Sequence, residues 1–228
     1  MFPVIILSGG LATRMRPVTE KIPKSMIDVN GAPFIHHQIT LLKKNNVSHV
    51  ILCVGYLGEQ IEEYIGNGNK YGMHIEYSYD GDLLLGTGGA IAKIGDRLPN
   101  TFFVLYGDSY LDVNYQKVEN AFKMSDKKGL MTVYKNNNQW DTSNVVYKQN
   151  KLIKYSKTNK TEDMNYIDYG LGILKSSVFT AFASNSVFDL ATVYEQLSNE
   201  NQLEGYEVFE RFYEIGSPQG LSDLCKIL

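Results

Sequence analysis

Two consecutive glycines lie between an apolar run and two basic residues near the start of the chain. Gly9-Gly10 follows the apolar residues 4–7, and Arg14 and Lys24 come soon after. Glycines let the backbone turn tightly, so that several N–H groups converge and can hold phosphate oxygens. Arg14 adds a forked cation and Lys24 adds a point charge. The stretch of residues 8–14, called the first loop below, therefore predicts a polyphosphate site.

Two common phosphate-binding motifs do not fit the first loop. The P-loop requires Gly-Lys and then Ser or Thr after its spacer, and the dinucleotide fingerprint requires G-x-G-x-x-G with a downstream acid. Neither pattern is present around Gly9-Gly10. A double glycine after a strand also fits a plain turn. The prediction of a phosphate site therefore depends on Arg14, Lys24 and the motifs farther along the chain.

Two acidic residues at predicted strand ends are candidates for a metal site. Asp108 follows the predicted strand at residues 101–105, and Glu214 lies near the end of a later one. Open α/β sheets place ligands at the carboxyl ends of their strands. Mg²⁺ prefers a few carboxylates together with phosphate oxygens and water. We therefore expect Asp108 and Glu214 to bind Mg²⁺ beside a triphosphate, with Glu210 and Asp112 in reserve and a plain turn as the alternative for Asp108.

Four segments in this order resemble the signature of the sugar-phosphate nucleotidyltransferases. They are residues 7–17 with Pro23-Lys24, residues 86–90, Gly107-Asp108 and residues 214–218. The resemblance covers almost the whole chain. It implies that the first loop and Arg14 hold the β- and γ-phosphates, that Lys24 approaches the α-phosphate, and that residues 86–90 lie against the nucleoside. The nucleotide-binding residues are then Leu7, Ser8, Gly9, Gly10, Ala12, Thr13, Gly55, Thr87, Gly88 and Gly89, although Ala12 stands where the family has a glycine.

The resemblance also implies the reaction, in which an NTP transfers its nucleotidyl group to a phosphate monoester and releases pyrophosphate. A phosphate monoester has a second pKa of about 6, so it is largely dianionic at pH 7 and needs no general base. Its oxygen attacks the α-phosphorus in line once the two are oriented. Charge on the α-phosphate and on pyrophosphate would be stabilised by Mg²⁺ and by the catalytic residues Arg14, Lys24 and Asp108. The nucleobase stays open between GTP, CTP and UTP.

The acceptor-binding residues implied by the resemblance lie in the second half of the chain. They are Asn144, Lys157, Asp168 and Gly170. Two of them stand in altered surroundings. Ser156 precedes Lys157 where many members have a glutamate that binds sugar hydroxyls, and Asp168 stands in a segment where the family often has asparagine. Asp168 could bind hydroxyls or an amino group.

Several functions remain open at this level. The leading interpretation is a nucleotidyltransferase acting on a hexose or heptose 1-phosphate. A cytidylyltransferase acting on a non-sugar phosphate, such as phosphocholine, is the alternative, because residues 213–215 are similar to those enzymes and the sugar-binding glutamate is missing. Trp140 and Asp141 could contribute to the acceptor pocket, although packing explains Trp140 equally well. Retention of Arg14, Lys24 and Asp108 argues against a regulatory subunit without catalysis, and a dinucleotide-dependent oxidoreductase is less favoured still.

The elements that must position these residues form an α/β pattern. In the first half, apolar strand-like runs alternate with helical spacing, which is typical of βαβ units and a parallel sheet. Expected strands there are residues 4–7, 50–54, 74–77 and 101–105, and expected helices are residues 34–45, 59–65 and one opening at residues 85–89. In the second half, we expect strands at residues 130–134, 144–147, 152–155, 166–174 and 207–215, helical segments at 176–183 and 188–198, and a last helix from Ser217-Pro218.

These elements predict a Rossmann-like, mainly parallel or mixed sheet flanked by helices, with antiparallel additions in the second half. The resemblance names it as the nucleotide-diphospho-sugar transferase fold. We expect a single domain of residues 1–228, with a nucleotide-binding half at residues 1–125 and an acceptor-binding half at residues 126–228.

Bulk properties exclude several classes of partner. The formal net charge of −3 gives no general attraction to nucleic acid. No apolar run approaches the roughly 20 residues of a membrane span, which favours a cytoplasmic protein without a membrane partner. Cys53 and Cys225 suit a reduced compartment and structural roles.

Exposed helix faces are compatible with a homodimer. The four histidines, His36, His37, His49 and His74, share no ligand spacing, so none is assigned a metal or catalytic role.

Overall fold

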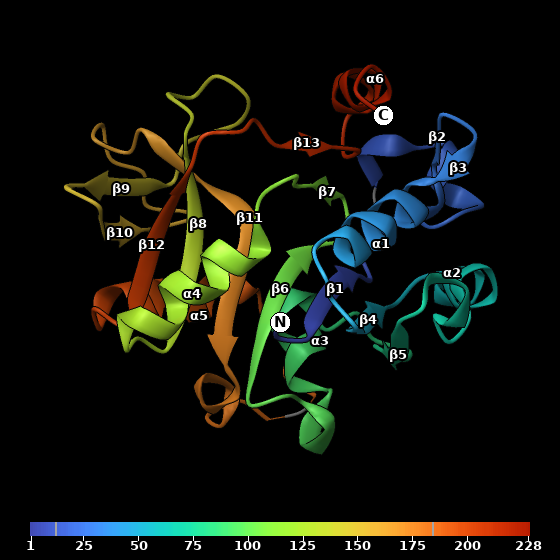
Figure 1. The fold of residues 1–228 in the computed structure, drawn as a ribbon, viewed down its shortest axis with the longest axis horizontal. Coiled ribbons are helices and arrows are strands. Elements are labelled where there is room, and N and C mark those ends of the chain that lie inside the picture. The colour runs from blue at the N-terminus through green and yellow to red at the C-terminus, as the bar shows by residue number, and fades with distance from the viewer. Residues whose placement is uncertain (12, 184) are drawn as a thin grey trace.

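A mixed sheet of nine strands forms the centre of the molecule (Figure 1). The structure is a computed structural model that describes residues 1–11, 13–183 and 185–228. The strand order is β10-β9-β11-β6-β1-β4-β5, with β8 paired to β11 and β12 paired to β8. The strands of this sheet are β1 (Val4–Ser8), β4 (His49–Val54), β5 (His74–Tyr79), β6 (Thr101–Tyr106), β8 (Gly129–Lys135), β9 (Val145–Lys148), β10 (Lys151–Tyr155), β11 (Tyr166–Lys175) and β12 (Leu203–Val208).

Two small sheets lie beside the large one. The first is the hairpin of β2 (Asp28–Val29) with β3 (Ala32–Pro33), and the second pairs β7 (Ser109–Tyr110) with β13 (Tyr213–Glu214). The second sheet matters for function because it joins the segment after β6 to a segment near the end of the chain.

The strands β6, β1, β4 and β5 are parallel neighbours. Their apolar runs are continuous because both faces of the sheet are covered. In β1, Ile5 belongs to the apolar cluster on one face, whereas Val4 and Ile6 belong to the cluster on the other. This part of the predicted α/β fold is confirmed.

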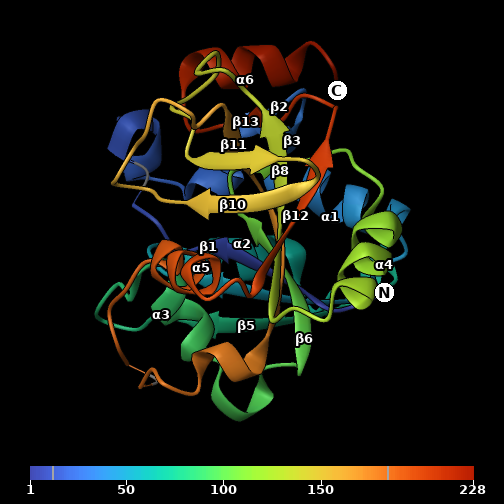
Figure 2. The same cartoon turned by 90° about the vertical axis from the view of Figure 1, so that its left-hand side faces the viewer.

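Helices cover both faces of the sheet. α1 (Phe34–Lys44), α2 (Gly58–Ile65) and α4 (Tyr115–Ser125) pack on one face, and α3 (Gly86–Ala92) and α5 (Leu190–Asn199) pack on the other. Figure 2 shows α1 and α4 on the opposite side of the molecule from α3 and α5. The last helix, α6 (Pro218–Cys225), instead packs near the hairpin of β2 and β3, where Leu224 and Val29 share a small apolar cluster.

Two predictions for the second half of the chain were wrong. Residues 207–215 do not form one strand: β12 ends at Val208, and β13 contains only two residues and belongs to the small sheet. Phe209, which lies within the predicted strand, is 78% exposed. The expected antiparallel additions are present, since β10 pairs with β9 and β11 pairs with β8 in this way, whereas β12 pairs parallel with β8. Of the predicted helical segment at residues 176–183, only a 3-10 turn, Ser176–Phe179, forms.

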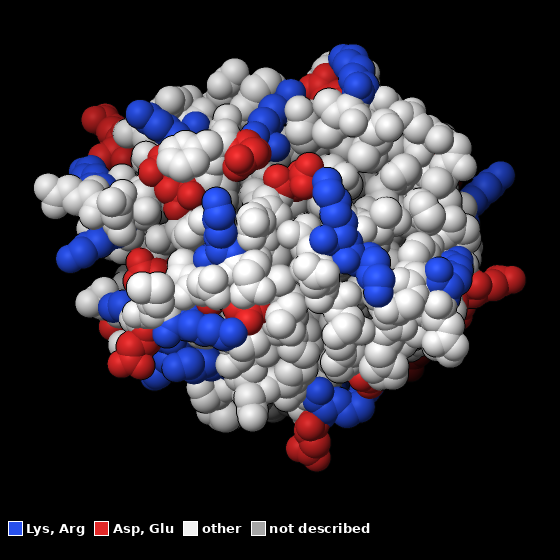
Figure 3. All heavy atoms as spheres, in the orientation of Figure 1, with Lys and Arg blue, Asp and Glu red and all other residues white. Residues whose placement is uncertain are grey.

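The charged surface and the cysteines agree with the bulk composition. Figure 3 shows acidic and basic side chains interspersed on the face that it presents. Cys53 and Cys225 are both free, and Cys53 is buried. In the described part of the chain, no helix has the length and apolar character needed to cross a membrane.

The glycines that open α3 allow a close contact with the segment before α5. The N–H groups of Gly88 and Gly89 donate to the Phe188 carbonyl oxygen over 3.0 and 3.3 Å. A β-carbon at Gly88 would lie 2.3 Å from the Phe188 ring, and one at Gly89 would lie 2.2 Å from the Ser186 carbonyl oxygen. Both positions therefore require glycine for packing.

Substituting Gly89→Ala should lower the free energy of unfolding by about 1–3 kcal/mol, as overpacking does in other proteins. The new methyl group would overlap backbone that cannot rotate away. Gly10→Ala is the control: a β-carbon there meets nothing within 4 Å, so we expect a change within about 0.5 kcal/mol. Chemical denaturation of both variants measures the difference. Equal stability of the Gly89→Ala protein and the wild type would contradict the close packing.

Candidate active site

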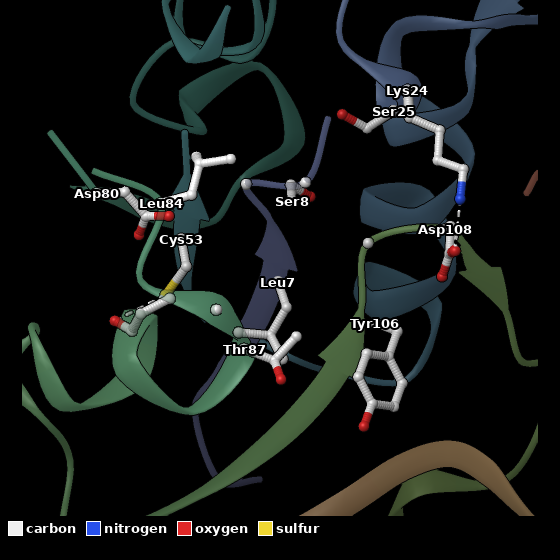
Figure 4. A pocket seen from close by; sticks show the side chains of 15 residues that line it. Leu7, Ser8, Lys24, Ser25, Cys53, Asp80, Leu84, Thr87, Tyr106 and Asp108 are labelled. Atoms are coloured by element: carbon white, nitrogen blue, oxygen red, sulfur yellow. Dashed lines mark hydrogen bonds and ion pairs between the residues drawn. The ribbon is translucent and has the colours of Figure 1, made fainter. Parts of the chain in front are cut away.

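An open cavity of about 300 Å³, called the first cavity below, lies at the carboxyl ends of β1, β4 and β6. Figure 4 shows Lys24 and Asp108 on one side of it and Asp80, Leu84 and Cys53 on the other. The residues that line it are Leu7, Ser8, Gly9, Gly10, Lys24, Ser25, Cys53, Asp80, Leu84, Gly86, Thr87, Ala90, Tyr106, Gly107 and Asp108. Much of the predicted nucleotide-binding set therefore surrounds one space.

Two hydroxyl groups in the first cavity are without a hydrogen-bond partner among the described residues. The Oγ atoms of Ser8 and Ser25 are buried and form no hydrogen bond with the described part of the protein. A buried polar group without a partner is costly, so such groups commonly serve a ligand. Together with the backbone of Gly9 and Gly10, the two hydroxyls can donate to anionic oxygens.

Two further glycines hold the first loop in place. A β-carbon at Gly55 would lie 2.6 Å from the Gly9 carbonyl oxygen, and one at Gly107 would lie 2.3 Å from the Ser8 Oγ. Gly55, which the sequence assigned to nucleotide binding, thus lies behind the loop and is not among the residues lining the first cavity. Its absent side chain lets the end of β4 approach the loop.

An ion pair joins Lys24, in the turn after the first loop, to Asp108 at the end of β6. Lys24 Nζ donates to Asp108 Oδ2 over 2.7 Å, and the Ser109 hydroxyl donates to Asp108 Oδ1 over 3.3 Å. The Lys24 side chain is 17% exposed and that of Asp108 is 33% exposed. Lys24 lies in a 3-10 turn, Lys24–Met26, that follows Pro23. The pair is therefore partly buried at the edge of the first cavity.

The motif at residues 214–218 lies against Arg14 and Lys24 at Gly216. A β-carbon there would lie 2.6 Å from Glu214 Oε2, 2.9 Å from Lys24 Nζ and 3.4 Å from Arg14 Nη2. Because Gly216 has no side chain, Arg14, Lys24 and Glu214 can gather around one point. The Ile215 N–H also donates to the Asp108 carbonyl oxygen over 3.0 Å. Residues nearly 200 positions apart are thus brought into contact.

Glu214 is oriented by the start of α6. Its carboxylate accepts from the Gly216 N–H and from the Ser217 hydroxyl. Ser217 is also the N-cap of α6, since its Oγ accepts from the Gly220 N–H over 3.0 Å, and Pro218 follows it as the sequence predicted. Glu214 pairs with Ser109 across the small sheet. The backbone places it directly beside Asp108.

A second cavity of about 350 Å³ begins at Asp108 and extends away from the first. Tyr106 and Asp108 line both cavities. The second cavity is lined by Arg14, Tyr106, Asp108, Ser109, Trp140, Asp141, Ile167, Asp168, Tyr169, Gly170, Phe212, Glu214 and Ser217. Two compartments that meet at one carboxylate can hold two reactants side by side.

Asp168 is a largely desolvated carboxylate in the second cavity. Burial raises the pKa of Asp168 to about 6, against a hydrogen bond from the Gly170 N–H and the charge of Lys157, which lower it. The Gly170 N–H donates to Asp168 Oδ1 over 3.0 Å. Gly170 has a φ of +99°, which favours glycine. Asp168 is therefore ionised at pH 7 and turned toward the second cavity by the local backbone.

Two predicted acceptor-binding residues do not line the second cavity. Asn144 supports Asp168 from behind, because its Oδ1 accepts from the Asp168 N–H over 2.8 Å. Lys157 forms an ion pair with Asp189, the N-cap of α5. Glu195 of α5 accepts from the Ser156 hydroxyl and the Lys157 N–H. The carboxylate of Glu195 thus contacts Ser156, which stands where many family members have a glutamate.

Trp140 and Asp141, which the sequence offered as pocket residues, both line the second cavity. The Arg211 guanidinium lies 3.5 Å from the centre of the Trp140 ring and also pairs with Asp223 of α6. This cation–π contact fixes the ring on its outer face. Trp140 is 41% exposed, so it is not a core residue.

The remaining predicted nucleotide-binding residues divide into four groups. Thr87 lines the first cavity, and its hydroxyl accepts from the Leu190 N–H and donates to Asp189. Gly88 and Gly89 pack against residues 186–188 and are not among the residues lining the first cavity. Thr13 lines neither cavity. Ala12 lies outside the described residues.

Asp80 is a functional candidate that sequence reasoning missed. It follows β5 and is only 7% exposed, and burial raises the pKa of its carboxyl group. Asp80 Oδ2 accepts from the Leu85 N–H over 3.3 Å. Its position in the sequence could have identified Asp80, because Asp108 was identified as an acid that follows a parallel strand.

Comparison with known proteins gives concordant results. The family model described as Nucleotidyl transferase matches residues 3–221. D-glycero-alpha-D-manno-heptose 1-phosphate guanylyltransferase of Campylobacter jejuni is 30% identical over 216 residues, covering 94% of this chain and 95% of that protein. Mannose-1-phosphate guanylyltransferase catalytic subunit beta of Xenopus tropicalis is 28% identical over 231 residues, covering 98% of this chain and 64% of that protein.

Solved structures share the fold. The crystal structure of HddC from Yersinia pseudotuberculosis complexed with GMP-PN superposes with a TM-score of 0.79 at 22% identity, covering 100% of this chain and 99% of that one. The matched family model spans all four motifs, the first loop, both cavities and the Lys24–Asp108 pair. The chain therefore belongs to the nucleotidyl transferase family, whose members are pyrophosphate-releasing enzymes.

Proposed function

We propose that this enzyme transfers GMP from GTP to a hexose or heptose 1-phosphate and releases pyrophosphate. The observation that carries the proposal is the meeting of two cavities at Asp108, beside Lys24. GTP would occupy the first cavity and the sugar phosphate the second. The names of the guanylyltransferase relatives support both the nucleotide and the acceptor.

The first cavity offers what a triphosphate requires. Backbone N–H groups of Gly9 and Gly10 and the hydroxyls of Ser8 and Ser25 would donate to phosphate oxygens. Lys24 would exchange part of its contact with Asp108 for the α-phosphate. Most of the groups offered to the triphosphate are thus neutral hydrogen-bond donors, and Lys24 adds a positive charge.

The two carboxylates fit a Mg²⁺ ion. Asp108 and Glu214 lie on adjacent segments next to the phosphate-binding surface, and hard oxygen ligands are those that Mg²⁺ prefers. We infer that both residues hold Mg²⁺, which supplies charge neutralisation for the triphosphate and for pyrophosphate. Glu214 would turn from Gly216 and Ser217 to do so. Asp112 and Glu210 line neither cavity, which favours Glu214 over the reserve candidates.

The acceptor needs orientation rather than activation. At pH 7 its phosphate is already largely dianionic. Arg14, which lines the second cavity, would hold this phosphate beside the α-phosphorus, in addition to the role that the resemblance gives it with the nucleotide. Asp168 would accept a hydrogen bond from a sugar hydroxyl, and Trp140 would contact the sugar ring. Proximity and charge stabilisation then carry the reaction.

Guanine is supported by the chemistry of Asp80. A carboxylate can accept hydrogen bonds from both N1–H and the 2-amino group of guanine, whereas uracil and cytosine offer no such pair of donors on one edge. Asp80 lines the first cavity on the side away from Lys24. We therefore infer that Asp80 reads the base.

The remaining expectations fit this proposal. We infer that the enzyme acts in the cytoplasm, where NTPs are available. We also infer that residues 1–125 supply most of the nucleotide site and residues 126–228 most of the acceptor site. A homodimer remains a proposal about its assembly.

A substrate matrix tests the function directly. Pyrophosphate release is measured with GTP, CTP, UTP and ATP against hexose and heptose 1-phosphates and phosphocholine, in Mg²⁺. We expect release with GTP and a sugar 1-phosphate. Release with CTP and phosphocholine instead would replace the acceptor and base proposals, and no release with any pair would contradict the enzyme reading.

Variants in the same assay test the catalytic pair. Lys24→Ala and Asp108→Asn should each lower the rate by about 10²–10³-fold, the usual loss for a group that stabilises transition-state charge. Lys21→Ala is the matched control, because Lys21 is an exposed lysine in the same segment and lines neither cavity. Equal losses in all three variants would argue against a specific role for Lys24.

Base selection is tested with ITP, which lacks the 2-amino group of GTP. The wild type should prefer GTP over ITP in kcat/KM by about tenfold or more, as expected for a hydrogen bond to a charged group. Asp80→Asn should reduce this preference to near unity. The control is Asp82→Asn, since Asp82 is exposed and does not line the first cavity. An undiminished preference in Asp80→Asn would rule out Asp80 as the base reader.

The pH dependence tests Asp168. With a pKa of about 6, Asp168 is ionised above that pH and protonated below it, so acceptor binding should weaken as pH falls from about 7.5 to 5.5. The acceptor phosphate titrates in the same range. The comparison is therefore the ratio of acceptor KM between wild type and Asp168→Asn at each pH. We expect the variant to bind less tightly at high pH and the ratio to approach one at low pH; a constant ratio would exclude titration of Asp168.

A further inference from the structure

Two histidines and one glutamate converge at the end of the sheet opposite the two cavities. His49 begins β4 and His74 begins β5, whereas the first cavity lies at the carboxyl ends of the neighbouring strands. His49 and His74 are direct partners in the parallel register of these strands. Glu76 follows His74 by two residues, so its side chain lies on the same face of β5. The register therefore assembles a cluster from two strands.

The three ligand atoms point to one place. Glu76 Oε1 lies 2.7 Å from His49 Nε2 and 3.3 Å from His74 Nε2. All three atoms lie within 4.8 Å of one another. The two imidazole nitrogens and the carboxylate oxygen are thus close enough together for a single cation to bind all three.

A fourth residue orients the carboxylate. Arg97 Nη1 lies 3.2 Å from Glu76 Oε2, and Arg97 Nη2 donates to the Tyr77 carbonyl oxygen over 3.4 Å. Arg97 thus binds one carboxylate oxygen and leaves Oε1 for the histidines. Residues outside the ligand set commonly fix ligand orientation in this way.

We propose that His49, His74 and Glu76 bind one divalent transition-metal ion of the Zn²⁺ class. Such an ion takes imidazole and carboxylate ligands at about 2.0–2.2 Å, which places tetrahedral ligand atoms roughly 3.3 Å apart. The His74–Glu76 distance already has this value. His49 Nε2 and Glu76 Oε1, which lie 2.7 Å apart, would have to separate by about 0.6 Å to match the same tetrahedral spacing. Water completes the coordination.

The ligand chemistry separates this site from the one at Asp108. Imidazole suits Zn²⁺, Co²⁺, Ni²⁺ and Cu²⁺, whereas Mg²⁺ prefers oxygen ligands and water. The two sites also lie at opposite ends of the strands. The enzyme would thus carry two cation sites of different preference.

The position of the cluster indicates what the ion does. β5 is the edge strand of the sheet, next to β4. An ion held by His49 on one side and by His74 and Glu76 on the other joins the edge strand to its neighbour. It therefore stabilises the folded chain in proportion to its occupancy.

The test is metal binding by tag-free protein that has been treated with chelator and dialysed. Co²⁺ and Zn²⁺ are the probes, with excess Mg²⁺ present to occupy the oxygen-rich site. We expect one equivalent of Co²⁺ with the visible absorption of tetrahedral coordination, displacement by Zn²⁺, and a rise in Tm. His49→Gln and His74→Gln should each weaken binding by at least about tenfold, since each removes a direct ligand.

A matched histidine substitution completes the test. His36→Gln removes a histidine of α1 that contacts Tyr71 rather than Glu76, and it should bind Co²⁺ as the wild type does. The His74 side chain is 66% exposed, so its substitution should leave the metal-free Tm unchanged. Absence of a tetrahedral Co²⁺ spectrum in the wild type, or equal binding by His74→Gln and wild type, overturns the proposal. Pyrophosphate release in Mg²⁺ is measured alongside, and its presence or absence has no bearing on this site.

Discussion

The Lys24–Asp108 ion pair is the contact on which the site depends. It joins a turn after β1 to the end of β6. Both charges are partly buried, and pairing offsets the cost of their desolvation. The same carboxylate lines both cavities. The contact fixes the position of the Lys24 side chain at the edge of the first cavity, next to the carboxylate that both cavities share.

The parallel sheet and its strand-end residues could be predicted because their signals are local. Continuous apolar runs identify β1, β4 and β6, and the carboxyl ends of parallel strands meet at one edge. That rule alone brings Ser8 and Asp108 together. It applies equally to Asp80, which was missed because no neighbouring motif drew attention to it. The site was thus predictable where a residue follows a strand directly.

The remaining features depend on contacts between distant segments. Gly88 packs against Phe188, and Asn144 accepts a hydrogen bond from the Asp168 N–H, and neither contact can be predicted from residue type or spacing. The late strand at residues 207–215 was predicted too long because exposure, such as that of Phe209, is set by tertiary structure. The pairing of His49 with His74 follows from strand register. Register is fixed by the packing of whole strands and not by spacing along the chain.

The missing side chain of Gly216 also bears on when the enzyme becomes functional during its synthesis. The nascent chain exposes the first loop, Lys24 and Asp108 long before residue 216 leaves the ribosome. Glu214 and the backbone of Ile215 can reach these residues only when their own segment docks. A polypeptide translated only as far as Asp108 therefore contains the first loop but lacks the contacts that gather around Gly216. These contacts can form only after the chain between Asp108 and Gly216 has been made.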